Sequence, residues 1–199
     1  MAQTKHVFVF LEIFSREGGI QSYVKDILQA YSRLENVAAE VFLLRDSAEV
    51  ENPFAANANL RFHYNKTQSG KTQNGKTQNA NVGRLKFALA LFTHLLKNRP
   101  ARVFCGHIHL APLVEKICGL FKIPYTVLTY GKEVWEPLPA NKQRALQNAD
   151  RIWTISRYSR DRLCAANQID PSKVDFLFCA VDGQVFQPQP KDPELVQRY

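Results

Sequence analysis

Short apolar segments alternate with amphipathic segments along almost the whole chain. Apolar or alternating runs predict strands at 5–11, 38–45, 60–64, 101–108, 124–130, 150–156 and 173–178. Apolar positions three and four residues apart predict helices at 20–31, 85–96, 110–121, 140–149 and 157–167. Strands that alternate with helices predict an α/β fold, with a Rossmann-like, doubly wound, mostly parallel sheet and helices on both faces.

The helix expected around 85–96 has two readings. Leu85, Leu89, Phe92 and Leu96 are spaced to share one face, and Arg84, Lys86, Lys97 and Arg99 flank them. We expect this apolar face to pack on the sheet. The alternative is peripheral contact with an anionic membrane, because a basic amphipathic helix suits that surface.

The segment "KTQSGKTQNGKTQNAN" interrupts the alternation with three copies of a five-residue unit. It has no apolar face to bury, so we predict a mobile surface insertion over 65–82. Its three lysines contribute to a formal net charge of +8. The remaining positive excess suits either an anionic partner or simple solubility.

Composition excludes several classes of protein. Apolar residues make up 45% of the chain, yet no run is long enough for a membrane span. The first residues lack the pattern of a signal peptide, and the four cysteines form no CxxC pair, so we expect a cytoplasmic protein with reduced core thiols. Aromatic residues lie mostly in apolar strands, which argues against a nucleic-acid partner.

The candidate chemistry lies where strands end, because ligands of open parallel sheets bind beyond the carboxyl ends of the strands. Gly18 and Gly19 lie between the first strand and the first helix, and Gln21 falls in that helix's first turn. Glycines and a helix N-terminus together can offer backbone N–H groups to an anion. The alternative is a turn that merely lets the helix start.

Two further strand ends carry polar side chains. His107 and His109 follow the fourth strand; we expect a ligand contact or ordinary structural histidines there, and no metal, since a third protein ligand is missing nearby in sequence. Tyr130, Gly131 and Glu133 follow the fifth strand, where a binding loop and a solvated turn are equally good readings.

The sixth expected strand ends at Ser156, with Arg157 next to it. Ser156 suits a helix cap, which alone would explain it, and Arg157 adds positive charge near the same edge. A nicotinamide dehydrogenase is disfavoured because the G-x-G-x-x-G fingerprint is missing, although Asp46 after the second strand fits the ribose-binding acid of that class.

Five motifs in order give the chain a family resemblance. They are the Gly-Gly loop, an apolar strand with a nearby histidine, "YGKE", "ADRIWTISRYSRDRL" and "VDGQVFQPQP". Together they resemble the N-terminal half of the family 4 (group 1) retaining glycosyltransferases of GT-B fold. The resemblance runs over nearly the whole chain, with the repeats as an insertion. Two departures are Tyr130, where many members have histidine, and Cys179-Ala180, where Asn-Gly is usual.

The resemblance implies an acceptor-side domain over 1–188 and, over 189–199, the start of a connection to a C-terminal donor-binding domain that lies outside this chain. Asp182, Phe186 and Pro188 match the interdomain connection. The implied partners are a nucleotide-sugar and an acceptor glycan or lipid, and the implied reaction needs no cofactor and no metal. Implied substrate- and phosphate-binding residues are Gly18, Gly19, Gln21, His107, His109, Tyr130, Gly131, Glu133, Ser156 and Arg157.

The resemblance identifies no catalytic residue in this half, because no convincing nucleophile stands out. We therefore expect the chain alone to lack transferase activity and to bind acceptor weakly. The alternative from another class is a non-catalytic Rossmann-like module that binds an anionic small molecule or a partner protein.

Overall fold

The computed structural model describes residues 3–65, 80–181, 183, 186–188, 190–191 and 193–198. Its strands are β1 (Thr4–Phe10), β2 (Val37–Leu43), β3 (Leu60–Tyr64), β4 (Arg102–Cys105), β5 (Tyr125–Thr129), β6 (Arg151–Thr154) and β7 (Val174–Phe176). Its helices are α1 (Gly19–Ser32), α2 (Ala80–Asn98), α3 (Ala111–Phe121), α4 (Ala140–Gln147), α5 (Arg157–Asn167) and α6 (Pro193–Arg198), with short 3-10 turns η1 (Lys132–Val134) and η2 (Pro171–Lys173).

Within the described ranges the strands form one seven-stranded sheet in the order β3-β2-β1-β4-β5-β6-β7. Each neighbouring pair is parallel, with Phe10 beside Leu43 and Val9 beside Cys105 in register. After β3 the chain returns across α2 to place β4 on the other side of β1. This reversal makes β1 and β4 the point where the two halves of a doubly wound sheet diverge, and the predicted fold class is confirmed.

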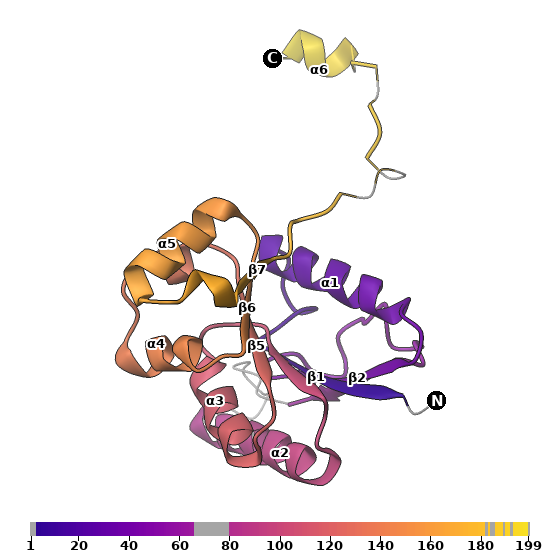
Figure 1. Ribbon diagram of the computed structural model, residues 1–199. Helices are drawn as coiled ribbons and strands as arrows, with labels where there is room; N and C mark the ends of the chain where they lie inside the picture. Colours follow the sequence, from indigo (N-terminus) through magenta and orange to yellow (C-terminus); the bar gives the residue numbers. More distant parts are fainter. Residues whose placement is uncertain are drawn as a thin grey trace.

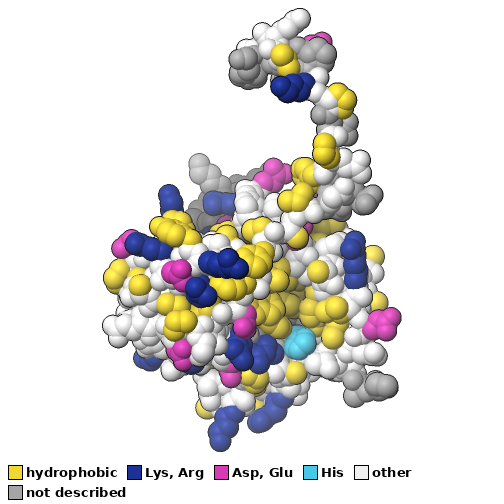
Figure 2. Space-filling view, turned by 45° about the horizontal axis from the view of Figure 1, so that its top comes forward, with side chains coloured by type: hydrophobic (Ala, Val, Ile, Leu, Met, Phe, Trp, Pro, Cys, Tyr) yellow, Lys and Arg dark blue, Asp and Glu magenta, His cyan; other side chains and the backbone are white. Residues whose placement is uncertain are grey.

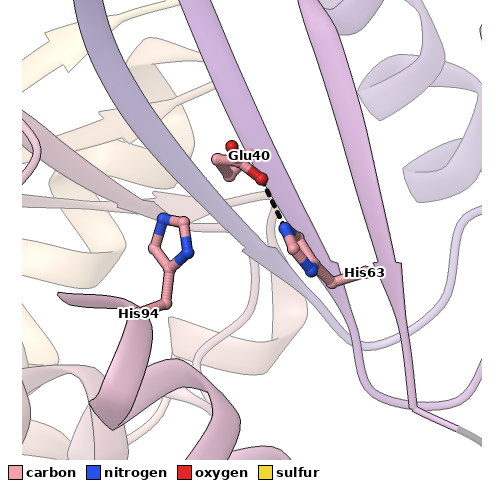
Figure 3. A group of neighbouring side chains, drawn as sticks. All are labelled: Glu40, His63 and His94. Carbon is pink, nitrogen blue, oxygen red and sulfur yellow. Dashed lines mark hydrogen bonds and ion pairs between the residues drawn. The ribbon is translucent and has the colours of Figure 1, made fainter. Parts of the chain in front are cut away.

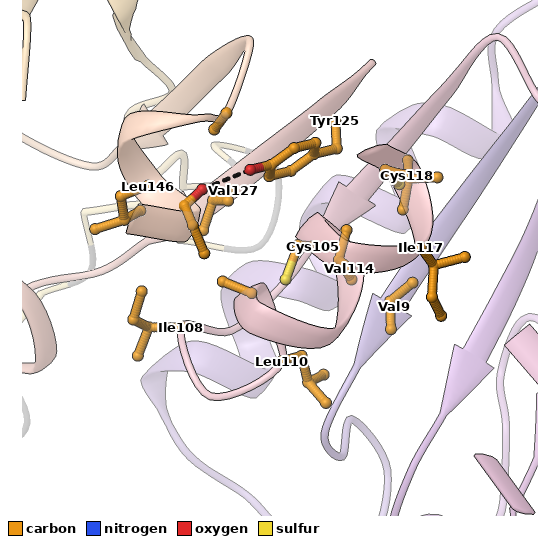
Figure 4. Close-up of a cluster of buried hydrophobic side chains, with 14 of the residues drawn as sticks. Val9, Cys105, Ile108, Leu110, Val114, Ile117, Cys118, Tyr125, Val127 and Leu146 are labelled. Carbon is orange, nitrogen blue, oxygen red and sulfur yellow. Dashed lines mark hydrogen bonds between the residues drawn. The ribbon is translucent and has the colours of Figure 1, made fainter. Parts of the chain in front are cut away.

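Helices lie on both faces of the sheet (Figure 1). The core consists of two apolar layers, one on each face. In β1, Val7 and Val9 point into the layer under α2, α3, α4 and α5, whereas Phe8 and Phe10 point into the layer under α1. All four are at most 2% exposed, as expected for a strand covered on both faces. Figure 4 shows part of the first layer, where the Tyr125 hydroxyl donates to the Ala145 carbonyl at 2.7 Å.

The buried face of α2 is not the one that the sequence predicted. Phe87, Leu91 and Leu95 face the sheet and are at most 2% exposed, while Leu85 and Leu89 are 71% and 60% exposed. Leu96 is also exposed and Phe92 is half-buried. Because apolar residues occur all round this helix, more than one stripe fits helical spacing, and packing against β1 and β2 selects the stripe that carries Phe87.

Several smaller expectations have mixed outcomes. Most of the predicted insertion, 66–79, lies outside the described residues, and α2 already begins at Ala80. Cys105 and Cys118 are buried thiols, but Cys179 is exposed, so the expectation of core thiols is wrong for that residue. No helix in the described ranges is both long and apolar enough to cross a bilayer.

The described part of the C-terminal segment runs away from the sheet and leads to α6 (Figure 1). Phe186 and Pro188 of the expected interdomain connection are exposed on it, and Asp182 lies outside the described residues.

Candidate functional site

A hollow of about 340 Å³ opens at the carboxyl ends of β1 and β4. Its lining residues are Phe10, Leu11, Glu12, Ile20, Gln21, Val24, Arg45, Gly106, His107 and His109. In Figure 2, a histidine and several Lys and Arg side chains border a recess lined by hydrophobic groups. The hollow lies at the topological switch point, which is where open α/β sheets bind ligands.

A buried carboxylate holds the loop that leads from β1 to α1. Asp46 is fully buried, and it accepts hydrogen bonds from the backbone N–H groups of Ile13 (2.6 Å), Phe14 (3.1 Å) and Ser15 (2.9 Å). Three N–H groups on one carboxylate fix the path of the loop before the helix starts. Because these loop N–H groups use both carboxylate oxygens, Asp46 is not available to bind a ribose hydroxyl. The feature that favoured a dehydrogenase is therefore lost.

The first turn of α1 forms one rim of the hollow. Its first intrahelical bond runs from Ser22 N–H to the Gly18 carbonyl (2.9 Å), and no side chain caps the helix among the described residues. The N–H groups of Gly19, Ile20 and Gln21 therefore have no partner within the helix. They sit at the positive end of the helix dipole, a favourable place for an anion.

The opposite rim depends on a close approach between two strands. A Cβ on Gly106 would lie 2.0 Å from Phe10 Cδ1, so only glycine fits beside that ring. The Gly106 N–H donates to Val9 (2.8 Å), and its carbonyl accepts from the Tyr130 hydroxyl (2.8 Å). Tyr130 is buried, and burial raises the pKa of its phenol, so it supports this rim from within as a neutral donor.

His107 and His109 stack at the mouth of the hollow, with ring centroids 4.9 Å apart. The His109 N–H donates to His107 Nδ1 (3.1 Å), so the neutral His107 ring carries its proton on Nε2. Burial, helped by the charges of His109, Arg45 and Lys142, lowers the pKa of His107 to about 4. His107 is therefore an uncharged N–H donor at neutral pH.

Three cations and one carboxylate set the charge at and around the hollow. Arg45 lies 3.5 Å from Glu12, and Arg16 lies 3.8 Å from the same Oε1 atom. Lys142 of α4 donates to His109 Nδ1 at 2.7 Å. The arrangement offers cationic and N–H donors for a phosphate and one carboxylate acceptor for hydroxyl groups.

The remaining predicted residues lie along the same sheet edge but do not line the hollow. Gly131 and Glu133 follow β5, and the Glu133 carboxylate accepts from the Tyr130 backbone N–H. Ser156 caps α5 by accepting from the Ser159 N–H (3.1 Å), as the capping interpretation predicted, and Arg157 is exposed beside it. Of the ten predicted residues, the structure places Gln21, His107 and His109 in the lining, with Gly18 and Gly19 at the start of α1.

Sequence reasoning missed Glu12, Arg45 and Lys142. Glu12 and Arg45 lie two residues after the ends of β1 and β2, so the strand-end rule could have found them. Their side-by-side position comes from the continued β1–β2 ladder, in which Arg45 N–H donates to Leu11 (2.8 Å). Lys142 carries no local signal, because it reaches His109 from a helix 33 residues later.

Comparisons with known proteins then define the architecture. No family model matches the chain, and no curated protein matches it in sequence. Among solved structures, a sucrose-phosphate synthase from Thermosynechococcus elongatus superimposes with a TM-score of 0.73 at 11% identity, covering 94% of this chain and 51% of that one. The chain has the fold of one half of a GT-B glycosyltransferase.

Other glycosyltransferases of known structure give the same result. Anabaena Alr3699/HepE, solved in complex with UDP-glucose, matches with a TM-score of 0.66 at 14% identity, over 98% of this chain and 50% of that one. The lipopolysaccharide outer core galactosyltransferase WaaB matches with a TM-score of 0.61 at 14% identity, over 89% and 46%. The GT-B half described here thus spans about half the length of the solved chains it matches.

Proposed function

We propose that this chain is the acceptor-side half of a retaining, family 4 glycosyltransferase. The whole protein would transfer a sugar from a nucleotide-sugar to a hydroxyl group of a glycan, lipid or small molecule, with a C-terminal domain binding the donor. One observation carries the proposal: within a GT-B half, a hollow rich in N–H donors lies at the switch point between β1 and β4.

The chemistry of glycosyl transfer suits this hollow. Positive charge develops on the anomeric carbon as the bond to the leaving phosphate breaks, and negative charge develops on that phosphate. Preorganised donors that face the phosphate lower the barrier without reorganising. The N–H groups of Gly19 and Ile20, at the end of α1, and the guanidinium of Arg45 supply such donors, so we expect no metal cofactor.

The acceptor needs groups that orient a hydroxyl. Glu12 presents a carboxylate that forms an ion pair with Arg45, and Gln21 presents an amide on the same rim. The Nε2–H of His107 is a neutral donor that keeps its proton across the physiological range. We propose that these three side chains position the acceptor against the donor sugar, and that His109, Tyr130, Gly131, Glu133, Ser156 and Arg157 extend or support the same edge.

Glycosyl transfer is tested with a panel of nucleoside diphosphate sugars and hydroxyl acceptors. We expect the whole protein to release nucleotide and form a glycoside, and residues 1–199 alone to form none. His107→Asn and Gln21→Ala should lower kcat/KM by at least about tenfold, a loss typical of one misplaced polar contact. Glu49→Gln, an exposed control near β2, should change it by less than twofold.

Two results would contradict the proposal. Transfer by residues 1–199 alone would show that a separate donor-binding domain is not needed. Saturable anion binding by the whole protein without transfer from any donor would favour a non-catalytic binding module.

Peripheral membrane contact is a separate part of the proposal. The outward face of α2 exposes Val82, Leu85, Leu89 and Leu96 beside Arg84, Lys86 and Lys97. Apolar side chains flanked by cations suit the interface of an anionic bilayer. Cosedimentation with phosphatidylglycerol vesicles should exceed that with phosphatidylcholine vesicles, and Leu85→Ser with Leu89→Ser should abolish it. Equal binding to both lipids, or no loss in the double variant, would contradict this contact.

A further inference from the structure

Three side chains that commonly bind metals meet at the β3 edge of the sheet, away from the hollow. Glu40 belongs to β2, His63 to β3 and His94 to α2, and one ligand atom from each lies within 4.8 Å of the other two. All three are half-buried. Figure 3 shows the Glu40 carboxylate and both rings converging on one small region between the sheet and the helix.

Packing holds these groups in place. His63 hydrogen-bonds to Glu40, and its ring stacks on Phe42 with centroids 4.3 Å apart. The His94 ring lies edge-on to the His63 ring, with centroids 5.6 Å apart. Asn98, one turn later in α2, places its amide nitrogen 3.3 Å from His94 Nδ1 and 3.1 Å from the His94 carbonyl. His94 would therefore bind a cation through Nε2 in the tautomer that carries its proton on Nδ1, with the Asn98 amide keeping its bond to the carbonyl.

The hydrogen bond between Glu40 and His63 does not account for the position of His94. That bond involves two side chains and does not require a particular residue at position 94. The structure nevertheless brings a second imidazole, that of His94, to the same point. Two imidazoles and one carboxylate are a typical ligand set for zinc, while calcium and magnesium prefer oxygen ligands throughout. A cavity of about 330 Å³, lined in part by His63, Tyr64 and Phe87, adjoins the cluster and has room for a water molecule.

We propose that Glu40, His63 and His94 bind a zinc-type transition-metal cation, with a fourth position open to water. The ion would join α2 to the outer strands of the sheet, so it would stabilise this edge. Lys5 and Arg61 are close enough to act on His94 electrostatically and would oppose a cation. We therefore expect weaker binding than at a closed site of four protein ligands.

The ligands escape sequence analysis because they come from three elements. Glu40 and His63 are 23 residues apart, and His94 follows 31 residues later, so no metal-binding spacing is present. The sequence-based expectation that no metal is bound considered only His107 and His109. Their rings stack on each other, and Lys142 donates to His109 Nδ1. The proposed site is independent of the glycosyltransferase proposal, since none of its ligands lines the hollow.

The test uses the chain without a polyhistidine tag, stripped of metal by dialysis. Titration with Zn²⁺ against a chromophoric chelator should give one ion per chain, and Co²⁺ should give the visible absorption bands of a four- or five-coordinate site. Zn²⁺ should also raise the melting temperature. Failure of both ions to bind above the level of a protein-free blank would overturn the proposal.

Variants then locate the ion. Glu40→Gln, His63→Gln and His94→Gln should each weaken Zn²⁺ binding by at least about tenfold, because losing even a residue that supports a ligand costs 10–100-fold. His109→Gln, which changes an exposed histidine elsewhere, should leave the affinity within twofold. Circular dichroism without metal checks that each variant folds. Retained affinity in the His94→Gln variant, or loss only in His109→Gln, would contradict the assignment.

Discussion

At the scale of single residues, Gly106 makes the rim of the hollow possible. Its backbone lies against the ring of Phe10, which is itself buried between α1 and the sheet. An added methyl group would overlap Phe10 Cε1 at 2.2 Å as well as Cδ1, and neither strand can move without breaking the bond from Gly106 N–H to Val9. The position therefore couples the shape of the hollow to the packing of the core.

Gly106→Ala should lower the free energy of unfolding by about 2–3 kcal/mol, because overpacking a filled core costs this much. The matched control is Gly19→Ala, where an added Cβ would meet nothing within 4 Å. That change should stay within about 0.5 kcal/mol or stabilise the helix slightly. Urea unfolding of both variants measures the difference, and equal stability would show that the close approach is unimportant.

His107 makes the folding stability of the protein depend on pH. Its pKa is about 4 in the folded chain, against an ordinary value of 6.5, because the ring is buried near other cations. Between pH 6.5 and 4 the unfolded chain binds a proton at this site that the folded chain does not. Stability therefore falls as the pH drops through this window, and it is unaffected by this residue above pH 6.5.

His107→Asn should remove that part of the pH dependence while keeping an acceptor for the His109 N–H. Between pH 7.5 and pH 4.5, the free energy of unfolding of the variant should fall by about 2 kcal/mol less than that of the wild type, after allowing for partial solvent screening. Denaturant unfolding at both pH values gives this difference, in which the other histidines cancel. Parallel pH profiles for the two proteins would contradict the buried, neutral state of His107.

At the scale of elements, the loop between β1 and α1 is ordered by Asp46 from the end of β2. Asp46→Asn should cost about 2–4 kcal/mol of stability, because an amide cannot accept the bonds of Ile13, Phe14 and Ser15 as a carboxylate does. Hydrogen exchange of these three N–H groups should speed up. Glu49→Gln serves as an exposed control, and an Asp46→Asn variant as stable as that control would contradict the anchoring role.

Helix α2 offers a test of which face packs on the sheet. Leu91 is fully buried and Leu89 is 60% exposed, although they are only two residues apart. Leu91→Ala should cost about 2–5 kcal/mol, and Leu89→Ala about 0.5 kcal/mol or less. Thermal unfolding of the pair measures this, and the reverse order would restore the face that the sequence predicted.

The success of sequence reasoning differed among these elements. The apolar run in β1 and the helical spacing of apolar residues in α5 are local signals. The ends of both elements therefore lie within one residue of the predicted ends. The apolar continuations after β4 and β6 made those two strands look longer than they are, since Ile108 and Ile155 pack in the core beyond the end of each strand. The face of α2 needed tertiary packing to decide between stripes that are equally apolar.

At the scale of the whole molecule, alternation of strands and helices predicted the sheet, and the strand-end rule predicted where to look for a site. Gln21 and His107, which the rule selected, meet in one hollow although 86 positions separate them. The rule could not tell which ends converge, because strand order rather than chain order places β4 beside β1. For that reason Ser156 and Arg157, at the end of β6, lie two strands away from the hollow.

The most direct measurement is an NMR titration of the ¹⁵N-labelled chain with UDP-glucose and, separately, with a simple sugar acceptor. We predict saturable shifts of the Gly19, Ile20 and Gln21 amides together with Gly106 and His107, greatly reduced in His107→Asn and retained in Glu49→Gln. Shifts confined to scattered lysines and abolished by salt, or no saturable change at the rim between β1 and β4, would contradict a sugar-phosphate site in this hollow.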